Sequence, residues 1–264
     1  MILAMLPACG RLAFEDMPAV DAELPPPVPV GCTGPDEDGD GWPNACDTCL
    51  FDPDPLHRDR DGDGVGDICD PRPDTGGDFA AIADPFDADL GLYSFAGTTS
   101  YPPGASALRM GSLTAEGQAT FAQPVTVTRV DFAVDVITPS SLVQWFGIWV
   151  DVGGARDKVF INGYYDPSDG FRSFHLKEES SPTVDRFSPY VTDSFGFTAG
   201  EQFRFVTDTD LLTGGPWRMT VTDLRSQLQR ASELTINIPH RTSGFLEANH
   251  MIVDVRYVVI YATH

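Results

Sequence analysis

The chain from residue 79 to residue 264 consists of short apolar runs separated by Gly, Pro, Ser and Asp. Polar and apolar residues alternate in Thr126–Val136, as expected for a strand with one buried face. The one helix candidate, Leu224–Leu234, is short. Further strand-like runs are Ala119–Phe121, Leu142–Val152, Lys158–Ile161, Gln202–Thr207, Trp217–Leu224, Glu233–Ile238 and Ile252–Tyr261. About ten strands over this length predict a mainly β fold, an antiparallel β-sandwich.

A tight turn is predicted at Asn162-Gly163, between Phe160-Ile161 and Tyr164-Tyr165, because Asn-Gly is a strong two-residue hairpin signal. The whole region resembles the concanavalin-like and laminin-G-like jelly rolls. In that resemblance Asp84–Asp87 is the first strand and Asp254–Tyr261 is the last. The sandwich is therefore expected to be a jelly roll over residues 79–264.

The pattern before residue 79 is different. Residues 10–31 are rich in proline, which suppresses helix and predicts an extended tether. Residues 32–73 are acidic and contain four of the five cysteines. Residues 71–78 form a short linker to the sandwich.

The acidic segment contains two copies of D-x-D-x-D-G-x-x-(N/D)-x-C-D, which begin at Asp36 and Asp59. Side-chain oxygens fall at positions 1, 3, 5, 9 and 12 and glycine at position 6, the spacing of a twelve-residue loop around a hard cation. Position 7 contributes its backbone carbonyl. The predicted Ca²⁺ ligands are Asp36, Asp38, Asp40, Trp42, Asn44 and Asp47 in the first loop, and Asp59, Asp61, Asp63, Val65, Asp67 and Asp70 in the second.

Twelve acidic residues lie between Asp36 and Asp70, against the two bases Arg58 and Arg60. Without cations these carboxylates repel one another, so the segment is expected to be loose without calcium and ordered with it. The alternative is an acidic disordered linker. A random acidic run would not repeat glycine and cysteine in register, which favours the calcium interpretation.

The two loops and the intervening Cys46-Asp47-Thr48-Cys49 resemble a pair of thrombospondin type 3 repeats. That family implies calcium wrapped by nearly irregular backbone with little hydrophobic core. Four cysteines allow three disulfide pairings, and the resemblance implies the sequential one, Cys32–Cys46 and Cys49–Cys69. The chain departs from the family at Asp52-Pro53, where Asn-Pro is usual, so the extra ligand that the family takes from that joint is not carried over.

The first nine residues, MILAMLPAC, resemble the end of a bacterial lipoprotein signal with Cys9 as the acylated residue. The resemblance implies export and a lipid anchor in the outer membrane or at the cell surface. An ordinary N-terminus with a chance cysteine is the alternative. An even number of remaining cysteines suits disulfides in an oxidising compartment. The formal net charge of −22 excludes the basic surface that nucleic acid needs.

No catalytic motif is apparent in the sandwich. The histidines do not form H-E-x-x-H, and the chain has no G-x-S-x-G and no phosphate-binding loop. Jelly-roll glycosidases carry E-x-D-x-x-E on one strand, and this chain lacks it. The six glutamates of the sandwich are isolated or lie in loop-like stretches: Glu116, Glu178, Glu179, Glu201, Glu233 and Glu247. The sandwich is therefore expected not to be an enzyme.

Aromatic residues suggest where a ligand would bind. Trp145, Phe146, Ile148 and Trp149 lie in one strand, either as a central core strand, which we favour, or as a sugar-stacking platform. Asp208 and Asp210 are either another calcium site or ordinary turn residues. The candidate ligand-binding residues, around an exposed loop, are Tyr164, Tyr165, Asp166, Asp169, Phe171 and Arg172.

These observations predict an exported, lipid-anchored, calcium-binding surface protein. Its sandwich is expected to be a non-catalytic adhesion or recognition module for a glycan or an extracellular protein. Two alternatives remain open. One is an extracellular polysaccharide-active enzyme whose carboxylates meet only in the folded sandwich. The other is a purely structural envelope protein.

Overall fold

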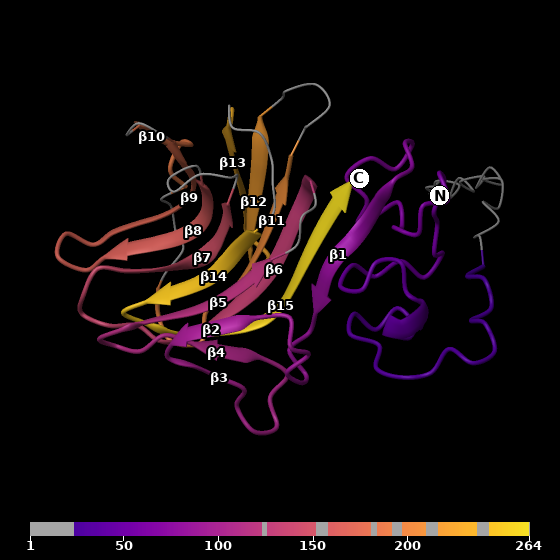
Figure 1. Ribbon diagram of the computed structural model, residues 1–264, viewed down its shortest axis with the longest axis horizontal. Helices are drawn as coiled ribbons and strands as arrows, with labels where there is room; N and C mark the ends of the chain where they lie inside the picture. Colours follow the sequence, from indigo (N-terminus) through magenta and orange to yellow (C-terminus); the bar gives the residue numbers. More distant parts are fainter. Residues whose placement is uncertain are drawn as a thin grey trace, which may run out of the picture.

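The computed structural model describes residues 24–122, 126–151, 158–180, 184–191, 197–209, 216–236 and 243–263. These residues form two antiparallel sheets packed face to face, preceded by an irregular acidic segment (Figure 1). The mainly β fold is as predicted. The signal-like residues 1–9 with Cys9, and most of the tether, lie outside the described residues. In the part that is described, no helix has the length and apolar character needed to cross a membrane.

The first sheet runs in the order β13-β12-β11-β6-β15-β4-β3, and β1 pairs with β15 beside this path. It comprises β1 (Asp78–Asp84), β3 (Thr99–Ser100), β4 (Leu108–Met110), β6 (Thr126–Thr138), β11 (Gln202–Asp208), β12 (Trp217–Asp223), β13 (Gln229–Leu234) and β15 (Ile252–Thr263).

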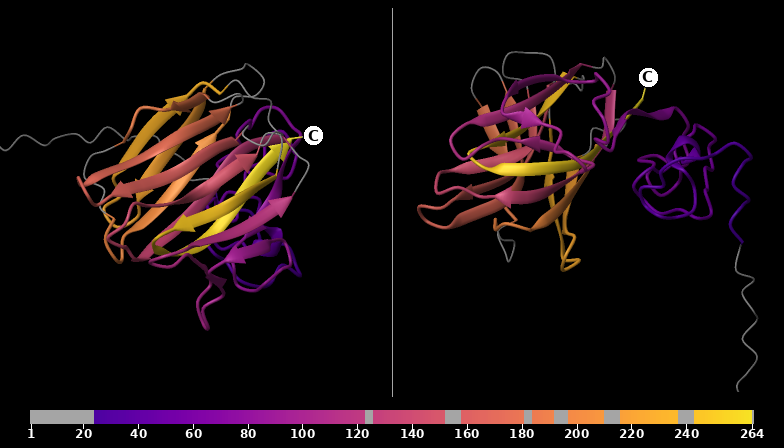
Figure 2. Two further views of the ribbon diagram at one scale, coloured as in Figure 1. Left: turned by 60° about the vertical axis from the view of Figure 1, so that its left-hand side comes forward. Right: turned by 90° about the horizontal axis from the view of Figure 1, so that it is seen from below.

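The second sheet runs in the order β10-β9-β8-β7-β14-β5-β2. It comprises β2 (Ser94–Gly97), β5 (Glu116–Ala122), β7 (Gln144–Asp151), β8 (Lys158–Asp166), β9 (Phe171–Ser180), β10 (Val184–Phe187) and β14 (Ser243–Asn249). Figure 2 shows the strands of the two sheets lying over one another as two layers.

The core lies between the two sheets because alternate residues of each strand point inward. Phe132 on β6 stacks on Phe205 on β11, with ring centroids 4.8 Å apart, and Phe146 from the other sheet meets Phe205 edge-on at 5.7 Å. The alternation predicted for Thr126–Val136 is confirmed by β6, but the polar side chain of Asp131 is buried too. It pairs with Arg204 and accepts a hydrogen bond from Tyr257, and both of these residues contact the acidic segment.

Three local predictions are wrong. Asn162-Gly163 is no turn but lies inside β8, and the chain reverses after Asp166 instead. Packing overrides the turn propensity: the Asn162 amide donates to the carbonyl of His175, and a Cβ on Gly163 would come within 2.8 Å of the Phe174 ring. Leu224–Leu234 forms a turn and then β13 rather than a helix. The first strand, β1, ends at Asp84 instead of starting there.

The acidic segment has an irregular backbone with one 3-10 turn, Asn44–Cys46, and lies beside β1 and the end of β15 (Figure 1). The disulfides are Cys32–Cys46 and Cys49–Cys69, the pairing that the family resemblance implies. The expectation of little hydrophobic core needs correction. Cys49, Val65 and Cys69 bury themselves against β15, where they form one cluster with Val259 and Tyr261.

Candidate functional site

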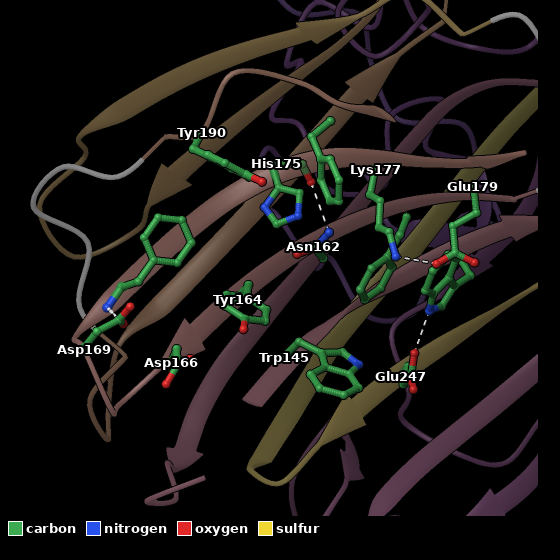
Figure 3. Close-up of a pocket in the computed structure, with 14 residues that line it drawn as sticks. Trp145, Asn162, Tyr164, Asp166, Asp169, His175, Lys177, Glu179, Tyr190 and Glu247 are labelled. Atoms are coloured by element: carbon green, nitrogen blue, oxygen red, sulfur yellow. Dashed lines mark hydrogen bonds and ion pairs between the residues drawn. The ribbon is translucent and has the colours of Figure 1, made fainter. Parts of the chain in front are cut away.

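A cleft of about 630 Å³ opens on the outer face of the second sheet (Figure 3). Strands β7, β8, β9 and β14 supply most of its walls. The lining residues are Trp145, Trp149, Phe160, Asn162, Tyr164, Asp166, Asp169, Phe171, His175, Lys177, Glu179, Phe187, Tyr190 and Glu247. Aromatic rings and carboxylates therefore share one concave surface.

Strand β7 divides its aromatic residues between the two faces. Phe146 and Ile148 are buried in the core, as favoured from the sequence, whereas Trp145 and Trp149 line the cleft. Trp149 stacks on Phe160 of the neighbouring strand, with centroids 4.2 Å apart and planes 3° apart. The core interpretation is thus wrong for the two tryptophans, because strict alternation along a strand sends every second residue outward.

Glu247, on β14, has its carboxyl in the wall of the cleft. Its side chain is largely buried, and the indole Nε1–H of Trp149 donates to its Oε2 at 2.6 Å (Figure 3). Burial raises the pKa of Glu247, the hydrogen bonds from Trp149 and Trp145 oppose this, and the charge of Glu116 raises it again. The carboxyl is therefore biased toward its protonated form.

Glu116 and Glu247 approach each other through the pairing of β5 with β14. In this register Gln118 lies opposite Glu247, and Glu116 lies opposite Asn249, so the two glutamates occupy diagonal positions on one face. Sequence reasoning missed them because they are far apart in the chain. The available signal was a single acid inside the strand-like run from Phe245 to Ala248.

Lys177 and His175 lie on β9 at the base of the cleft. Lys177 pairs with Glu179 and lies 3.5 Å from Asp185 Oδ2. His175 is buried, and Ser173 Oγ lies 3.0 Å from its Nδ1. Burial, with a smaller contribution from Lys177, lowers the pKa of His175 to about 4. The imidazole is therefore neutral at physiological pH.

The structure brings together most of the predicted ligand-binding residues. Tyr164, Asp166, Asp169 and Phe171 line the cleft. Tyr165 and Arg172 do not: Tyr165 stacks on Phe197 at 5.6 Å, and the Arg172 guanidinium lies over the Tyr165 ring at 5.8 Å. Each lies one residue along its strand from a residue that lines the cleft, so its side chain points to the opposite face of the sheet. Asp208 lies near Arg129, and Asp210 lies outside the described residues.

The two acidic loops have matching hydrogen bonds. In the first, Asp36 accepts from the backbone N–H groups of Gly39 at 2.8 Å and Gly41 at 3.0 Å, and Asn44 accepts from Glu37 at 3.0 Å. Positive φ angles of 77° and 100° at Gly39 and Gly41 permit this winding. In the second, the corresponding acceptors are Asp59 and Asp67, and the corresponding donors are Gly62, Gly64 and Arg60.

Carboxylates gather inside each loop. The groups whose oxygens all lie within 4.8 Å of one another, among the described residues, are Asp36 with Asp38 and Asp40, Asp59 with Asp61 and Asp63, and Asp63 with Asp70 and Asp78. The Oδ2 atoms of Asp38, Asp61 and Asp70 are buried without a hydrogen-bond donor. Burial raises the pKa of both Asp38 and Asp70 to about 7. Oxygen-only donors with free lone pairs suit a hard metal ion.

Trp42 and Val65 occupy position 7 of the two loops, where the predicted metal ligand is the backbone carbonyl oxygen. Their side chains are buried. Trp42 stacks on His57 with centroids 3.8 Å apart, and Val65 joins the cluster against β15. Asp47, at position 12, lies 3.7 Å from His57 Nε2. These contacts fix the loops against neighbouring structure.

The departure at Asp52-Pro53 has a structural role. The Arg204 guanidinium of β11 donates to Asp52 Oδ2 at 2.7 Å and also pairs with Asp131. Arg129 lies 3.7 Å from Asp52 Oδ2. Asp52 therefore joins the acidic segment to the sandwich, and the carboxylate in place of the usual amide supplies the charge for these pairs.

No protein-family model matches the chain, and no curated protein matches its sequence. Solved structures do match its fold. The CBM2 module of the evolved Dit protein of Lactobacillus casei BL23 phage J-1 is 8% identical, with a TM-score of 0.53, and the match covers 71% of this chain and 96% of that one.

Two further matches have similar coverage. SCLam, a non-specific endo-β-1,3(4)-glucanase of family GH16, is 10% identical with a TM-score of 0.51, over 72% of this chain and 93% of its own. The exoplasmic domain of VIP36 in a Ca²⁺- and Man2-bound form is 10% identical with a TM-score of 0.48, over 69% and 87%. The feature shared with the phage module and with SCLam is the jelly-roll fold, so the predicted jelly-roll sandwich is confirmed.

The prediction that the sandwich is not an enzyme is corrected by the match to the endo-β-1,3(4)-glucanase. A glycoside hydrolase has this fold, so a missing E-x-D-x-x-E strand does not make the domain non-catalytic. Here Glu116 and Glu247 come from two paired strands, an arrangement that no single-strand motif would reveal.

Proposed function

We propose that the sandwich hydrolyses a polysaccharide held in the cleft on the outer face of β9, β8, β7 and β14, with Glu247 as the proton donor. The observation that carries this proposal is the buried carboxyl of Glu247, with its raised pKa, between the tryptophans of the cleft. The fold shared with an endo-β-1,3(4)-glucanase and with a carbohydrate-binding module supports it.

Hydrolysis of a glycosidic bond needs one protonated carboxyl and one ionised carboxylate. Burial favours the protonated form of Glu247, and Glu116, exposed to solvent on the neighbouring strand, supplies the second carboxyl group. Glu247 donates its proton to the glycosidic oxygen as the bond to the anomeric carbon breaks. Glu116 accepts a proton from the water whose oxygen bonds to that carbon.

Diagonal positions on neighbouring strands are about 7–8 Å apart. The charge of Glu116 raises the pKa of Glu247, as expected for two glutamates at diagonal positions on one face. The aromatic rings of Trp145, Tyr164 and Phe171 supply apolar faces on which sugar rings stack.

The test is hydrolysis of soluble β-linked polysaccharides by wild type, Glu247→Gln and Glu116→Gln. We expect each substitution to lower kcat by about 10²–10⁴-fold while oligosaccharide binding persists. Glu233→Gln is the control, because Glu233 is an exposed residue of β13 in the other sheet. Full activity of Glu247→Gln, or wild type that binds polysaccharide without cleaving it, would contradict the proposal.

We further propose that the two acidic loops bind calcium as thrombospondin type 3 repeats do. The repeated hydrogen-bond scheme, the oxygen-only donors and the buried Oδ2 atoms of Asp38, Asp61 and Asp70 support this assignment. The residues that would hold the ions are the six predicted for each loop. Calcium would neutralise clustered carboxylates and fix the segment against β15, with no part in the hydrolysis.

We also propose that the protein is exported and anchored through a lipid on Cys9. The two disulfides support an oxidising compartment. Metabolic labelling with a radioactive or alkyne fatty acid should mark wild type but not Cys9→Ser. Equal labelling of both, or none of either, would refute the anchor.

A further inference from the structure

The cleft is lined by more acidic than basic residues. Lys177 is the one lysine or arginine among its described lining residues. His175 is neutral at physiological pH, because burial lowers its pKa to about 4. The carboxylic acids of the lining are Asp166, Asp169, Glu179 and Glu247. Even with Glu247 protonated, the cleft has an excess of negative charge.

The positive charge of Lys177 is already engaged. Its ammonium pairs with Glu179 and lies 3.5 Å from Asp185 Oδ2, and it lies over the rings of Trp149 and Phe187 at 5.9 Å and 5.8 Å. Lys158, on the same sheet, lies over the Phe245 ring at 5.2 Å and does not line the cleft. An acidic ligand group would have to displace a carboxylate from Lys177 to gain an ion pair.

Aromatic rings and acids gather at the end of the cleft near the turn between β8 and β9. Tyr164, Phe171 and Tyr190 follow one another with centroids 6.1 Å and 5.5 Å apart, and Asp166 and Asp169 lie beside them (Figure 3). The rings offer apolar faces to sugar C–H groups, and the carboxylates accept hydrogen bonds from sugar hydroxyls. Both features match an uncharged sugar chain.

We propose that the cleft selects uncharged polysaccharides and excludes those that carry carboxylate or sulfate groups, an inference that rests on the proposed function. An anionic chain would place charge after charge among carboxylates in a partly desolvated site, where repulsion is stronger than in water. A neutral chain meets no such cost. The neutral imidazole of His175 adds no positive charge to offset the repulsion.

The test uses the 264-residue chain with Glu247→Gln, so that ligands stay intact, and calorimetric titration with matched oligosaccharides. The neutral set is β-glucan, xylan and galactan oligosaccharides, and the anionic set is oligogalacturonides and sulfated galactan oligosaccharides. We expect the anionic set to bind at least about 10-fold more weakly, and to gain affinity as NaCl rises from about 20 to about 500 mM because salt screens the repulsion. Neutral binding should not change with salt.

A charge-removal variant sharpens the test. The double substitution Asp166→Asn with Asp169→Asn should reduce the difference in affinity between neutral and anionic oligosaccharides by several-fold. Asp89→Asn, in a loop outside the cleft, should leave that difference unchanged. Tighter binding of anionic than of neutral oligosaccharides would overturn charge selection and leave polysaccharide binding intact. Failure of every oligosaccharide to bind would overturn the proposed function, and this inference with it.

Discussion

The ring of Phe51, in the acidic segment, lies flat on the ring of Tyr257 on β15, with centroids 3.9 Å apart and planes 9° apart. The next residue, Asp52, accepts a hydrogen bond from Arg204 of β11 at 2.7 Å. The stacking of Phe51 on Tyr257 and the ion pairs of Asp52 with Arg204 and Arg129 therefore fix the joint between the two loops to the sandwich. The acidic segment is a packed layer on the first sheet rather than a loose connector.

Replacing Phe51 with alanine should loosen this layer. Loss of a partly buried aromatic contact is expected to cost about 2 kcal/mol, below the range for fully buried rings. Hydrogen exchange should speed up in residues 47–70 and stay unchanged in β8 and β9. Leu113→Ala, at an exposed apolar residue, is the control. Unchanged exchange in the acidic segment of Phe51→Ala would show that the stack contributes nothing.

Calcium removal should also act on the acidic segment first. At a free calcium concentration 100 times its Kd, each bound ion stabilises the folded loops by about 2.7 kcal/mol, and a chelator removes that contribution. Circular dichroism and limited proteolysis with and without chelator measure it. Asp38→Asn with Asp61→Asn should abolish the calcium effect, and Asp74→Asn, outside both loops, should keep it. Identical protection of wild type with calcium and with chelator would contradict calcium binding.

Gly163→Ala should destabilise the sandwich by about 1–3 kcal/mol, the usual cost of overpacking a core. The added Cβ would come within 2.8 Å of the Phe174 ring and 2.9 Å of the Phe146 ring. Gly76→Ala is a matched control, because its added Cβ meets nothing closer than 3.7 Å. Urea denaturation of both variants gives the comparison. Equal midpoints would mean that the core around β8 relaxes freely.

His175 should make the sandwich sensitive to acid. Its pKa falls from 6.5 in the unfolded chain to about 4 in the folded one, chiefly through burial. Between these values the unfolded state binds a proton that the folded state does not. The contribution of neutral His175 to the free energy of unfolding is therefore fully present above pH 6.5 and is lost as the pH falls toward 4. The full loss is roughly 3 kcal/mol.

Urea denaturation at several pH values tests this. His175→Gln should lower stability at pH 7, where it removes the packed ring, but should show a shallower decline on acidification. A decline as steep as that of wild type would assign the acid sensitivity to other groups.

Trp149→Phe should shift the pH dependence of hydrolysis. The indole N–H stabilises the ionised form of Glu247, so its removal raises the pKa of Glu247 further. Loss of activity at alkaline pH, read from kcat/KM, should therefore move to higher pH. Phe160→Leu is the control, since Phe160 stacks on Trp149 and is not among the groups that shift Glu247. A shift to lower pH would refute this role for the indole.

The sequence predicts most where the determining contacts are local. Each D-x-D-x-D-G repeat winds on itself through hydrogen bonds that span two to seven residues, such as those from Gly39 to Asp36 and from Glu37 to Asn44, so its spacing alone indicates the loop. The alternation in Thr126–Val136 likewise predicts β6. These elements carry their own signal.

Prediction from the sequence fails where contacts between residues far apart in the chain determine the local structure. Asn162-Gly163 has strong turn propensity, yet the rings of Phe146 and Phe174 pack where only glycine fits and keep β8 extended. Glu116 and Glu247 occupy diagonal positions on one face only because β5 pairs with β14 in one particular register, which no local pattern specifies. The docking of Phe51 on Tyr257 is of the same kind.

Strand β15 has apolar residues on both faces. Val258 and Ile260 point into the sandwich, while Val259 and Tyr261, at 2% and 3% exposure, are covered by the acidic segment. A sandwich cut out at residue 79 would expose this apolar strip to solvent, and such strips promote aggregation. The two parts would therefore have to be inherited, or transplanted into another protein, as a single unit.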